Sequence, residues 1–245
     1  MIDLEAAGAF GAYVAEPATG APVTGGVVLI HEIWGLADHI KDVADRLAAE
    51  GFVVVAPDLL SRAGIDAHLG AELQQILFSP DPAVRNAGQP RLREAMAPTR
   101  APDFSAWATT ALQRAVDFLE RQPGVGEHVG VVGFCFGGSY AFALAAADPR
   151  IRAAVPFYGS PPVSTEIDRI SAPMLAFYGD RDERLMDGLP QVREAMAAAG
   201  ADFTAVVYEG VGHAFFNDTN PHAYDASRAA DAWQRTLTFL RTHLA

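Results

Sequence analysis

The chain of 245 residues contains a single cysteine, Cys135, in a setting typical of a catalytic nucleophile. Residues 129–138, Val-Gly-Val-Val-Gly-Phe-Cys-Phe-Gly-Gly, form an apolar run that ends in Gly-x-Cys-x-Gly. Such spaced glycines permit the sharp strand-to-helix turn called the nucleophile elbow, here with Cys in place of Ser. A lone cysteine is more often a small buried apolar residue. The start of a helix, however, favours a thiolate, so Cys135 is the predicted nucleophile.

Two later segments supply a base and an acid in the chain order that this motif requires. A predicted strand at 173–178 is followed by Asp180, Asp182 and Glu183, and a later strand by His213. The histidine would pair with the thiolate and then donate a proton to the leaving group, while a carboxylate fixes its orientation. Spacing alone leaves all three acids open as candidates for that carboxylate.

The segment His-Glu-Ile-Trp-Gly at 31–35 follows another predicted strand, where this type of fold supplies one donor of an oxyanion hole. We expect the backbone N–H groups of Ile33 and Phe136 to form the pair of donors. Glu32 would then project toward the site. Trp34 either packs inside the protein or faces the substrate.

Short β-rich runs alternate with amphipathic stretches along most of the chain, a pattern typical of a mainly parallel sheet with helices on both faces. The predicted strands are 10–15, 27–30, 52–55, 129–132, 153–157, 173–178 and 203–208. The predicted helices begin at Asp38, Ser105, Gly137, Leu189 and Tyr224. The sequence therefore predicts one α/β domain over residues 1–245.

The stretch 59–104 interrupts this alternation. It contains five prolines and five arginines, among them Arg62, Arg85 and Arg91. A connection of that length is usually functional or carries short helices of its own. It is predicted to be either a solvated excursion or a partial lid over the site.

The composition narrows the classes of partner and compartment. A net charge of −12 repels nucleic acid and anionic lipid surfaces, so an anionic substrate would need a local arginine. One cysteine forms no intramolecular disulfide, and no Cys/His cluster has zinc-site spacing. With no basic leader and no long apolar run, we expect a cytoplasmic monomer or small homo-oligomer without a metal.

Five motifs together resemble the dienelactone hydrolase family of α/β-hydrolases. They are His-Glu-Ile-Trp-Gly at 31–35, Ala-Pro-Asp-Leu at 56–59, Gly-Phe-Cys-Phe-Gly-Gly at 133–138, Gly-Asp-Arg-Asp at 179–182 and Gly-His-Ala-Phe at 212–215. The resemblance implies the α/β-hydrolase fold and a cofactor-free lactone or ester hydrolase. It selects Asp182 as the triad acid and implies that Glu32 contacts the resting thiol and helps to generate the thiolate.

One position departs from the family pattern. Family members that act on the anionic dienelactone bind its carboxylate with arginines, one of them four residues after the catalytic histidine, where this chain has Asn217. The other arginine should come from the stretch 59–104, in which Arg85 is the candidate and Arg62 and Arg91 are alternatives. Trp34, Asn217 and Arg85 are therefore the predicted substrate-binding residues.

Several functions remain open at this point. The leading hypothesis is hydrolysis of a lactone or ester through an acyl-cysteine. Alternatives are a carboxylesterase or thioesterase acting on neutral or larger substrates, and a ligand-binding protein that keeps the fold without turnover. A redox role would need a resolving cysteine, which this chain does not contain.

Overall fold

The computed structural model describes residues 2–3, 10–161 and 167–245. In this part of the chain the strands form one sheet of eight, in the order β1-β2-β4-β3-β5-β6-β7-β8. The strands are β1 (Ile2–Asp3), β2 (Gly11–Ala15), β3 (Gly25–Ile30), β4 (Phe52–Pro57), β5 (Val129–Phe134), β6 (Ile151–Phe157), β7 (Met174–Gly179) and β8 (Phe203–Tyr208). Strands β3 to β8 pair in parallel, whereas β1 and β2 are antiparallel to their neighbours. The predicted mainly parallel sheet is confirmed.

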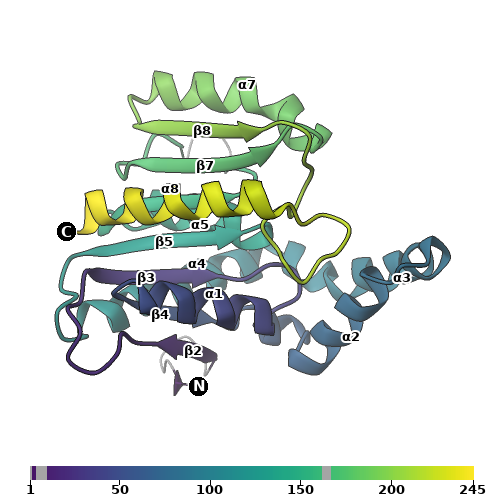
Figure 1. Ribbon diagram of the computed structural model, residues 1–245, viewed down its shortest axis with the longest axis horizontal. Helices are drawn as coiled ribbons and strands as arrows, with labels where there is room; N and C mark the ends of the chain where they lie inside the picture. Colours follow the sequence, from purple (N-terminus) through teal and green to yellow (C-terminus); the bar gives the residue numbers. More distant parts are fainter. Residues whose placement is uncertain (1, 4–9, 162–166) are drawn as a thin grey trace.

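Helices cover both faces of the sheet, as predicted. Helices α1 (Asp38–Ala49) and α8 (Ala226–Leu244) lie on the face turned toward the viewer in Figure 1, and α4 (Pro102–Glu120) and α5 (Phe136–Ala147) lie behind it. Helix α7 (Glu183–Ala198) packs against β7 and β8. Every residue of β3, β4, β5 and β7 is buried, which explains why these strands are continuous apolar runs in the sequence.

Several helices begin at other residues than predicted. Helix α7 begins at Glu183, six residues before the predicted start at Leu189, and continues through Pro190. Buried Leu185 and Leu189 lie four residues apart on its inner face, which favours the longer helix. Helix α8 continues to the buried Leu244, and the Asp225 carboxylate caps its first turn by accepting two backbone N–H bonds.

The stretch 59–104 is ordered and mostly helical. It contains the 3₁₀ turns Leu60–Ala63 and Ala97–Arg100 and, between them, α2 (Ala67–Leu77) and α3 (Pro82–Ala95). These two helices pack on each other as a hairpin and project beyond the carboxyl ends of the strands, at the right of Figure 1. The stretch thus carries short helices of its own, as connections of this length often do, and its role as a solvated excursion or a partial lid stays a prediction.

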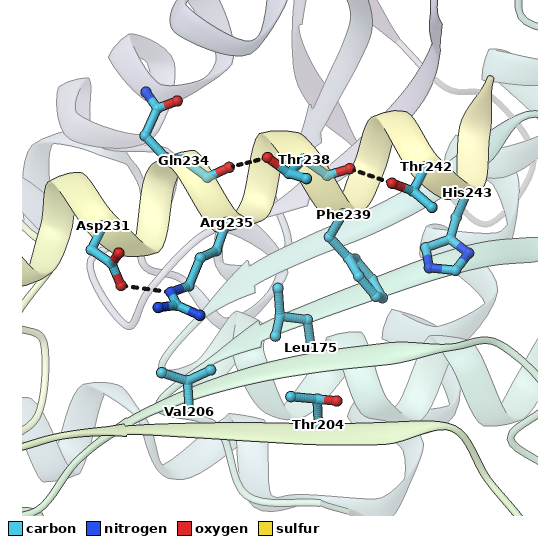
Figure 2. A pocket seen from close by; sticks show the side chains of 10 residues that line it. All are labelled: Leu175, Thr204, Val206, Asp231, Gln234, Arg235, Thr238, Phe239, Thr242 and His243. Atoms are coloured by element: carbon cyan, nitrogen blue, oxygen red, sulfur yellow. Dashed lines mark hydrogen bonds and ion pairs between the residues drawn. The ribbon is translucent and has the colours of Figure 1, made fainter.

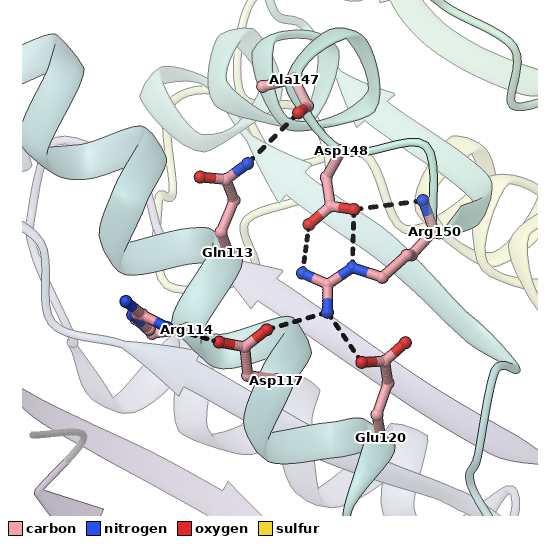
Figure 3. Close-up of polar contacts among 7 residues, drawn as sticks. All are labelled: Gln113, Arg114, Asp117, Glu120, Ala147, Asp148 and Arg150. Atoms are coloured by element: carbon pink, nitrogen blue, oxygen red, sulfur yellow. Dashed lines mark hydrogen bonds and ion pairs between the residues drawn. The ribbon is translucent and has the colours of Figure 1, made fainter. Parts of the chain in front are cut away.

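A network of ion pairs joins α4 to the end of α5 (Figure 3). The Arg150 guanidinium binds the buried Asp148 at 2.6 Å, Asp117 at 2.8 Å and Glu120 at 2.7 Å. The Asp148 hydrogen bond is the strongest influence on Arg150, and it holds the pKa of the guanidinium above its ordinary value. The network anchors the carboxyl end of the helix whose first turn follows Cys135.

No helix in the described ranges is long and apolar enough to span a bilayer.

Candidate active site

Cys135 lies at the turn between β5 and α5, directly before the first residue of the helix. Its φ of 55° lies in the left-handed region, which non-glycine residues rarely adopt. The turn requires its neighbouring glycines: a Cβ at Gly133 would lie 2.0 Å from the Gly137 carbonyl oxygen, and one at Gly137 would lie 2.2 Å from that of Ile30. The segment thus adopts the nucleophile-elbow geometry, with a partly buried thiol.

His213 lies between Asp182 and Cys135. Its Nδ1 is 2.5 Å from Asp182 Oδ2, and its side chain is 36% exposed. Burial lowers the pKa of His213, but hydrogen bonds to Asp182 and Cys135 outweigh that effect and raise it to about 10. For Asp182 burial acts in the other direction and raises the pKa, but the hydrogen bond and charge of His213 bring that pKa below its ordinary value. Asp182 and His213 thus form a hydrogen-bonded acid–base pair next to Cys135.

The three candidate acids have different partners. Asp182 contacts His213, whereas the Asp180 carboxylate accepts the backbone N–H of Gly210 at 2.8 Å. Glu183 is the exposed first residue of α7. The structure therefore places only Asp182, of these three, beside the histidine.

These positions predict unequal effects for two similar substitutions. Asp182→Asn removes the charge that orients and stabilises the His213 imidazolium, so we expect kcat to fall on the order of 10³-fold. Asp180→Asn keeps a side-chain oxygen that can accept the Gly210 N–H, so we expect a change of only about twofold. Steady-state kinetics on an activated ester measure kcat for both variants. A larger loss in Asp180→Asn would reverse the assignment of the acid.

The loop 31–35 is fixed by the buried ring of His31. Its Nδ1 donates to the Glu32 carbonyl at 2.7 Å, and its Nε2 accepts the Leu59 backbone N–H at 3.1 Å. Burial lowers the pKa of His31, consistent with this neutral tautomer. Gly137 N–H donates to the His31 carbonyl, which joins the loop to the start of α5.

Ile33 and Phe136 therefore come from two segments that are bonded together next to the thiol. Within the described part of the chain, neither backbone N–H donates to another protein atom. Both N–H groups can therefore bind another acceptor, and their role as oxyanion donors stays a prediction.

Glu32 is buried beside this site, with 2% of its surface exposed. Its carboxylate accepts hydrogen bonds from Tyr158 Oη at 3.2 Å and from Asn217 Nδ2 at 2.5 Å. Burial raises the pKa of Glu32, and nearby His39, Asn217, His213 and Tyr158 act in the opposite direction. Both carboxylate oxygens thus have protein partners.

Sequence reasoning missed Tyr158, which follows β6 at the same edge of the sheet. Its ring lies 5.0 Å from that of His213, and its φ of 39° marks a second strained backbone position near the thiol. Burial and the charges of Glu32 and Cys135 raise the pKa of Tyr158 well above its ordinary value, so its hydroxyl remains a donor. The available signal was a strand that opens into a Gly-containing loop at the edge where the other site residues lie.

The structure places Asn217 differently from the sequence prediction. Its side chain is fully buried, with Nδ2 on Glu32 and Oδ1 accepting from the backbone N–H and the hydroxyl of Thr219. The side chain thus holds the Glu32 carboxylate, and the expectation that Asn217 binds substrate stays a prediction.

The contact between Asn217 and Glu32 predicts a measurable stability effect. Removing the donor to a buried carboxylate costs about 1 to 3 kcal/mol, so Asn217→Ala should lower the free energy of unfolding by that amount. The penalty should shrink in a Glu32→Gln background, where the partner is uncharged. Urea denaturation of the four variants of this cycle measures both values. Equal penalties in the two backgrounds would contradict the contact.

The three arginines considered for substrate binding occupy different environments. Arg62 lies over the Trp107 ring at 4.9 Å, and Arg91 forms a paired contact with Glu72 on the surface. Arg85 lines a cavity together with Ile33 and Trp34. Of the three, Arg85 alone is brought to the oxyanion loop.

A second cavity lies elsewhere in the fold. It has about 460 Å³ of space and lies between α8 and strands β7 and β8, as Figure 2 shows. Leu175 and Thr204 lie near the starts of their strands, and Thr242 lies at the end of α8. This cavity is at the amino-terminal end of the strands, away from Cys135, so it is not the candidate active site.

Among the described residues, no group of three metal-ligating side chains comes together.

Known proteins share both the sequence and the fold. The model of the dienelactone hydrolase family matches residues 10–244. The chain belongs to the dienelactone hydrolase family. A "Putative carboxymethylenebutenolidase" of Yersinia pestis is 31% identical over 95% of this chain and 83% of that protein. One of Saccharolobus solfataricus is 34% identical over 88% of each.

The solved structures agree. A "Putative Dienelactone Hydrolase" of Klebsiella pneumoniae is 30% identical, has a TM-score of 0.78 and covers 95% of this chain and 92% of its own. The α/β-hydrolase fold of this dienelactone hydrolase family member is thereby shown. Family membership supports a hydrolase that acts on a small-molecule substrate.

Proposed function

We propose that this protein hydrolyses a lactone or carboxylic ester through an acyl-enzyme on Cys135. The observation that carries the proposal is His213, whose Nδ1 lies 2.5 Å from Asp182 Oδ2 and whose pKa is raised to about 10 by Asp182 and Cys135. An imidazole with that pKa is protonated at neutral pH. A protonated imidazole beside the sulfur stabilises the thiolate, the nucleophilic form of cysteine.

The first half of the reaction forms the acyl-enzyme. The Cys135 thiolate attacks the ester carbonyl carbon, and the carbonyl electron pair moves onto the oxygen. The Ile33 and Phe136 N–H groups stabilise this oxyanion. When it collapses, the carbon–oxygen bond breaks and the leaving alkoxide takes the proton of His213.

The second half releases the acid. Acylation removes the sulfur's charge, so His213 loses one of the influences that raise its pKa and can act as a base. It takes a proton from water, whose oxygen attacks the thioester. The thiolate then leaves, the carboxylic acid departs, and the thiolate–imidazolium pair is restored.

Glu32 has a separate place in this scheme. We assign it to the resting state, in which its buried negative charge opposes formation of a second anion at Cys135. Tyr158 and Asn217 hold its two oxygens and keep that charge at a fixed distance from the thiol. Substrate entry would then favour the thiolate by bringing the carbonyl to the oxyanion donors.

The test is a hydrolysis screen of lactones and activated esters, with and without a carboxylate group, on wild type and Cys135→Ala. Turnover of at least one class by wild type and its loss in Cys135→Ala support the acyl-cysteine route. Equal turnover by both proteins would exclude it. Binding without turnover in the wild type would favour a ligand-binding protein.

A second candidate is an esterase for neutral or larger substrates. It is favoured by the burial of Asn217, which leaves Arg85 as the cation at the oxyanion loop, in a chain of net charge −12. Arg85 already donates through Nη1 to the Ser79 carbonyl at 2.7 Å and the Pro80 carbonyl at 2.9 Å. An anionic lactone would therefore share this guanidinium with the backbone.

These positions predict a modest charge preference. Wild type should favour a carboxylate-bearing lactone over a neutral analogue by less than about 10³-fold in kcat/KM, equivalent to roughly 4 kcal/mol. Arg85→Gln should lower kcat/KM for the anionic lactone about tenfold, because a charge-assisted hydrogen bond contributes about 1.5 kcal/mol or more. Arg91→Gln is the matched control and should leave kcat/KM unchanged for both substrates. Equal losses of kcat/KM in the two variants would show that Arg85 does not bind the substrate.

A further inference from the structure

The cavity beside the oxyanion loop has a defined shape and composition. It holds about 330 Å³ between that loop and the α2–α3 hairpin. Ile33 and Trp34 line it from the loop, and Leu77, Phe78 and Leu92 line it from the hairpin. Ile33 also carries a proposed oxyanion donor, so a group bound here lies next to the reacting carbonyl.

Two aromatic rings give the cavity a rigid wall. The rings of Trp34 and Phe78 meet edge to face at 5.2 Å, and Trp34 is only 9% exposed. Helix α2 approaches the Trp34 backbone so closely that a Cβ at Gly70 would lie 2.3 Å from the Trp34 carbonyl oxygen. Because the Trp34 side chain is buried and its ring packs against that of Phe78, the wall is formed before a ligand arrives.

The other side of the cavity is tied to the loop that follows His213. His222 Nε2 lies 3.0 Å from the Ser79 carbonyl, and Gln74 donates to the Thr219 hydroxyl at 3.0 Å. The hairpin is thus fastened to the loop that carries the catalytic base. The cavity and the proposed triad belong to one packed unit.

We propose that this cavity is a subsite for one flat apolar ring of the substrate, attached close to the ester bond. The inference rests on the proposed ester hydrolysis and adds the class of substrate. Aromatic walls favour a ring over an alkyl chain of the same volume, because rings gain edge-to-face contacts. A volume of about 330 Å³ is near the lower end of the range for ligand pockets, which suits a single ring better than a long acyl chain.

Kinetics with four simple esters tests the subsite. Benzyl acetate and methyl phenylacetate carry a ring on either side of the ester bond, hexyl acetate carries a chain, and methyl acetate carries neither. In wild type, kcat/KM for at least one ring ester should exceed that for hexyl acetate by about tenfold. No preference for either ring ester would overturn the proposal.

A filling substitution locates the effect. Gln89 is an exposed residue of α3 that lines the cavity, and Asn86, also exposed on α3, does not line it. Gln89→Trp should raise KM for the preferred ring ester about tenfold and leave methyl acetate within about twofold. Asn86→Trp, the matched control, should leave KM unchanged for both esters. Equal losses on ring and methyl esters would overturn the assignment.

A binding measurement separates this proposal from the proposed reaction. Calorimetric titration of Cys135→Ala with the preferred ring ester requires no turnover. If wild type hydrolysed none of the four esters, ester hydrolysis would be in doubt, and the titration with benzyl acetate would still decide the subsite. Binding that is lost in Gln89→Trp and kept in Asn86→Trp supports the subsite. If no binding is observed, or if Gln89→Trp leaves binding unchanged, the subsite is excluded.

Discussion

Cys135→Ala is expected to lose ester hydrolysis by on the order of 10⁴-fold or more, because removing the nucleophile leaves only the oxyanion donors and binding contacts. The thiol is the only one in the chain, so iodoacetamide should label a single site and abolish activity in the same proportion. Cys135→Ser should also be poorly active, since an alkoxide is much harder to generate than a thiolate. Steady-state kinetics and mass spectrometry of the labelled protein measure these effects.

The control for this prediction concerns folding. Cys135 has a strained backbone, so the variants must be compared by circular dichroism and thermal unfolding before their rates are interpreted. A folded Cys135→Ala variant with full turnover would falsify the assignment of the nucleophile. Trapping a thioester by rapid acid quench of the wild-type protein provides an independent check on the intermediate.

The turn that carries Cys135 was the part of the site most easily predicted from local sequence. The elbow around Cys135 depends on neighbouring residues, since Gly133 and Gly137 must pack against backbone within a few residues or on the adjacent strand. The mainly parallel sheet was equally predictable, because buried strands are continuous apolar runs. His213 followed from its position after a strand in the required chain order.

Long-range packing decided what the sequence left open. Spacing did not separate Asp180 from Asp182; the loop that places Gly210 beside Asp180 leaves Asp182 for the histidine. Asn217 was expected at the substrate, yet it is buried against Glu32, which lies 185 positions away in the chain. Tyr158 was missed because its contact with that carboxylate depends on long-range packing and a left-handed backbone, and the Gly-containing loop after its strand does not single out this residue.

His213→Ala is expected to lower kcat by about 10² to 10⁴-fold, the range for a positioned acid–base group. The wild-type profile should also show a distinctive alkaline limb. A pKa of about 10 means that His213 carries its proton below that pH and loses it above, so the leaving group is no longer protonated. The rate constant for acylation should therefore fall as pH rises through about 10, provided the protein remains folded there.

Single-turnover kinetics with two leaving groups separates this interpretation from a general alkaline effect. An ester with a poor alcohol leaving group needs the His213 proton, whereas a 4-nitrophenyl ester leaves with little protonation. The alkaline limb should be pronounced for the first ester and weak for the second, and His213→Ala should remove the difference between them. If both esters lost activity equally above pH 10 in the wild type and in His213→Ala, the limb would report unfolding or another group. The proton would then have to come from elsewhere, and His213 could not be the acid that protonates the leaving group.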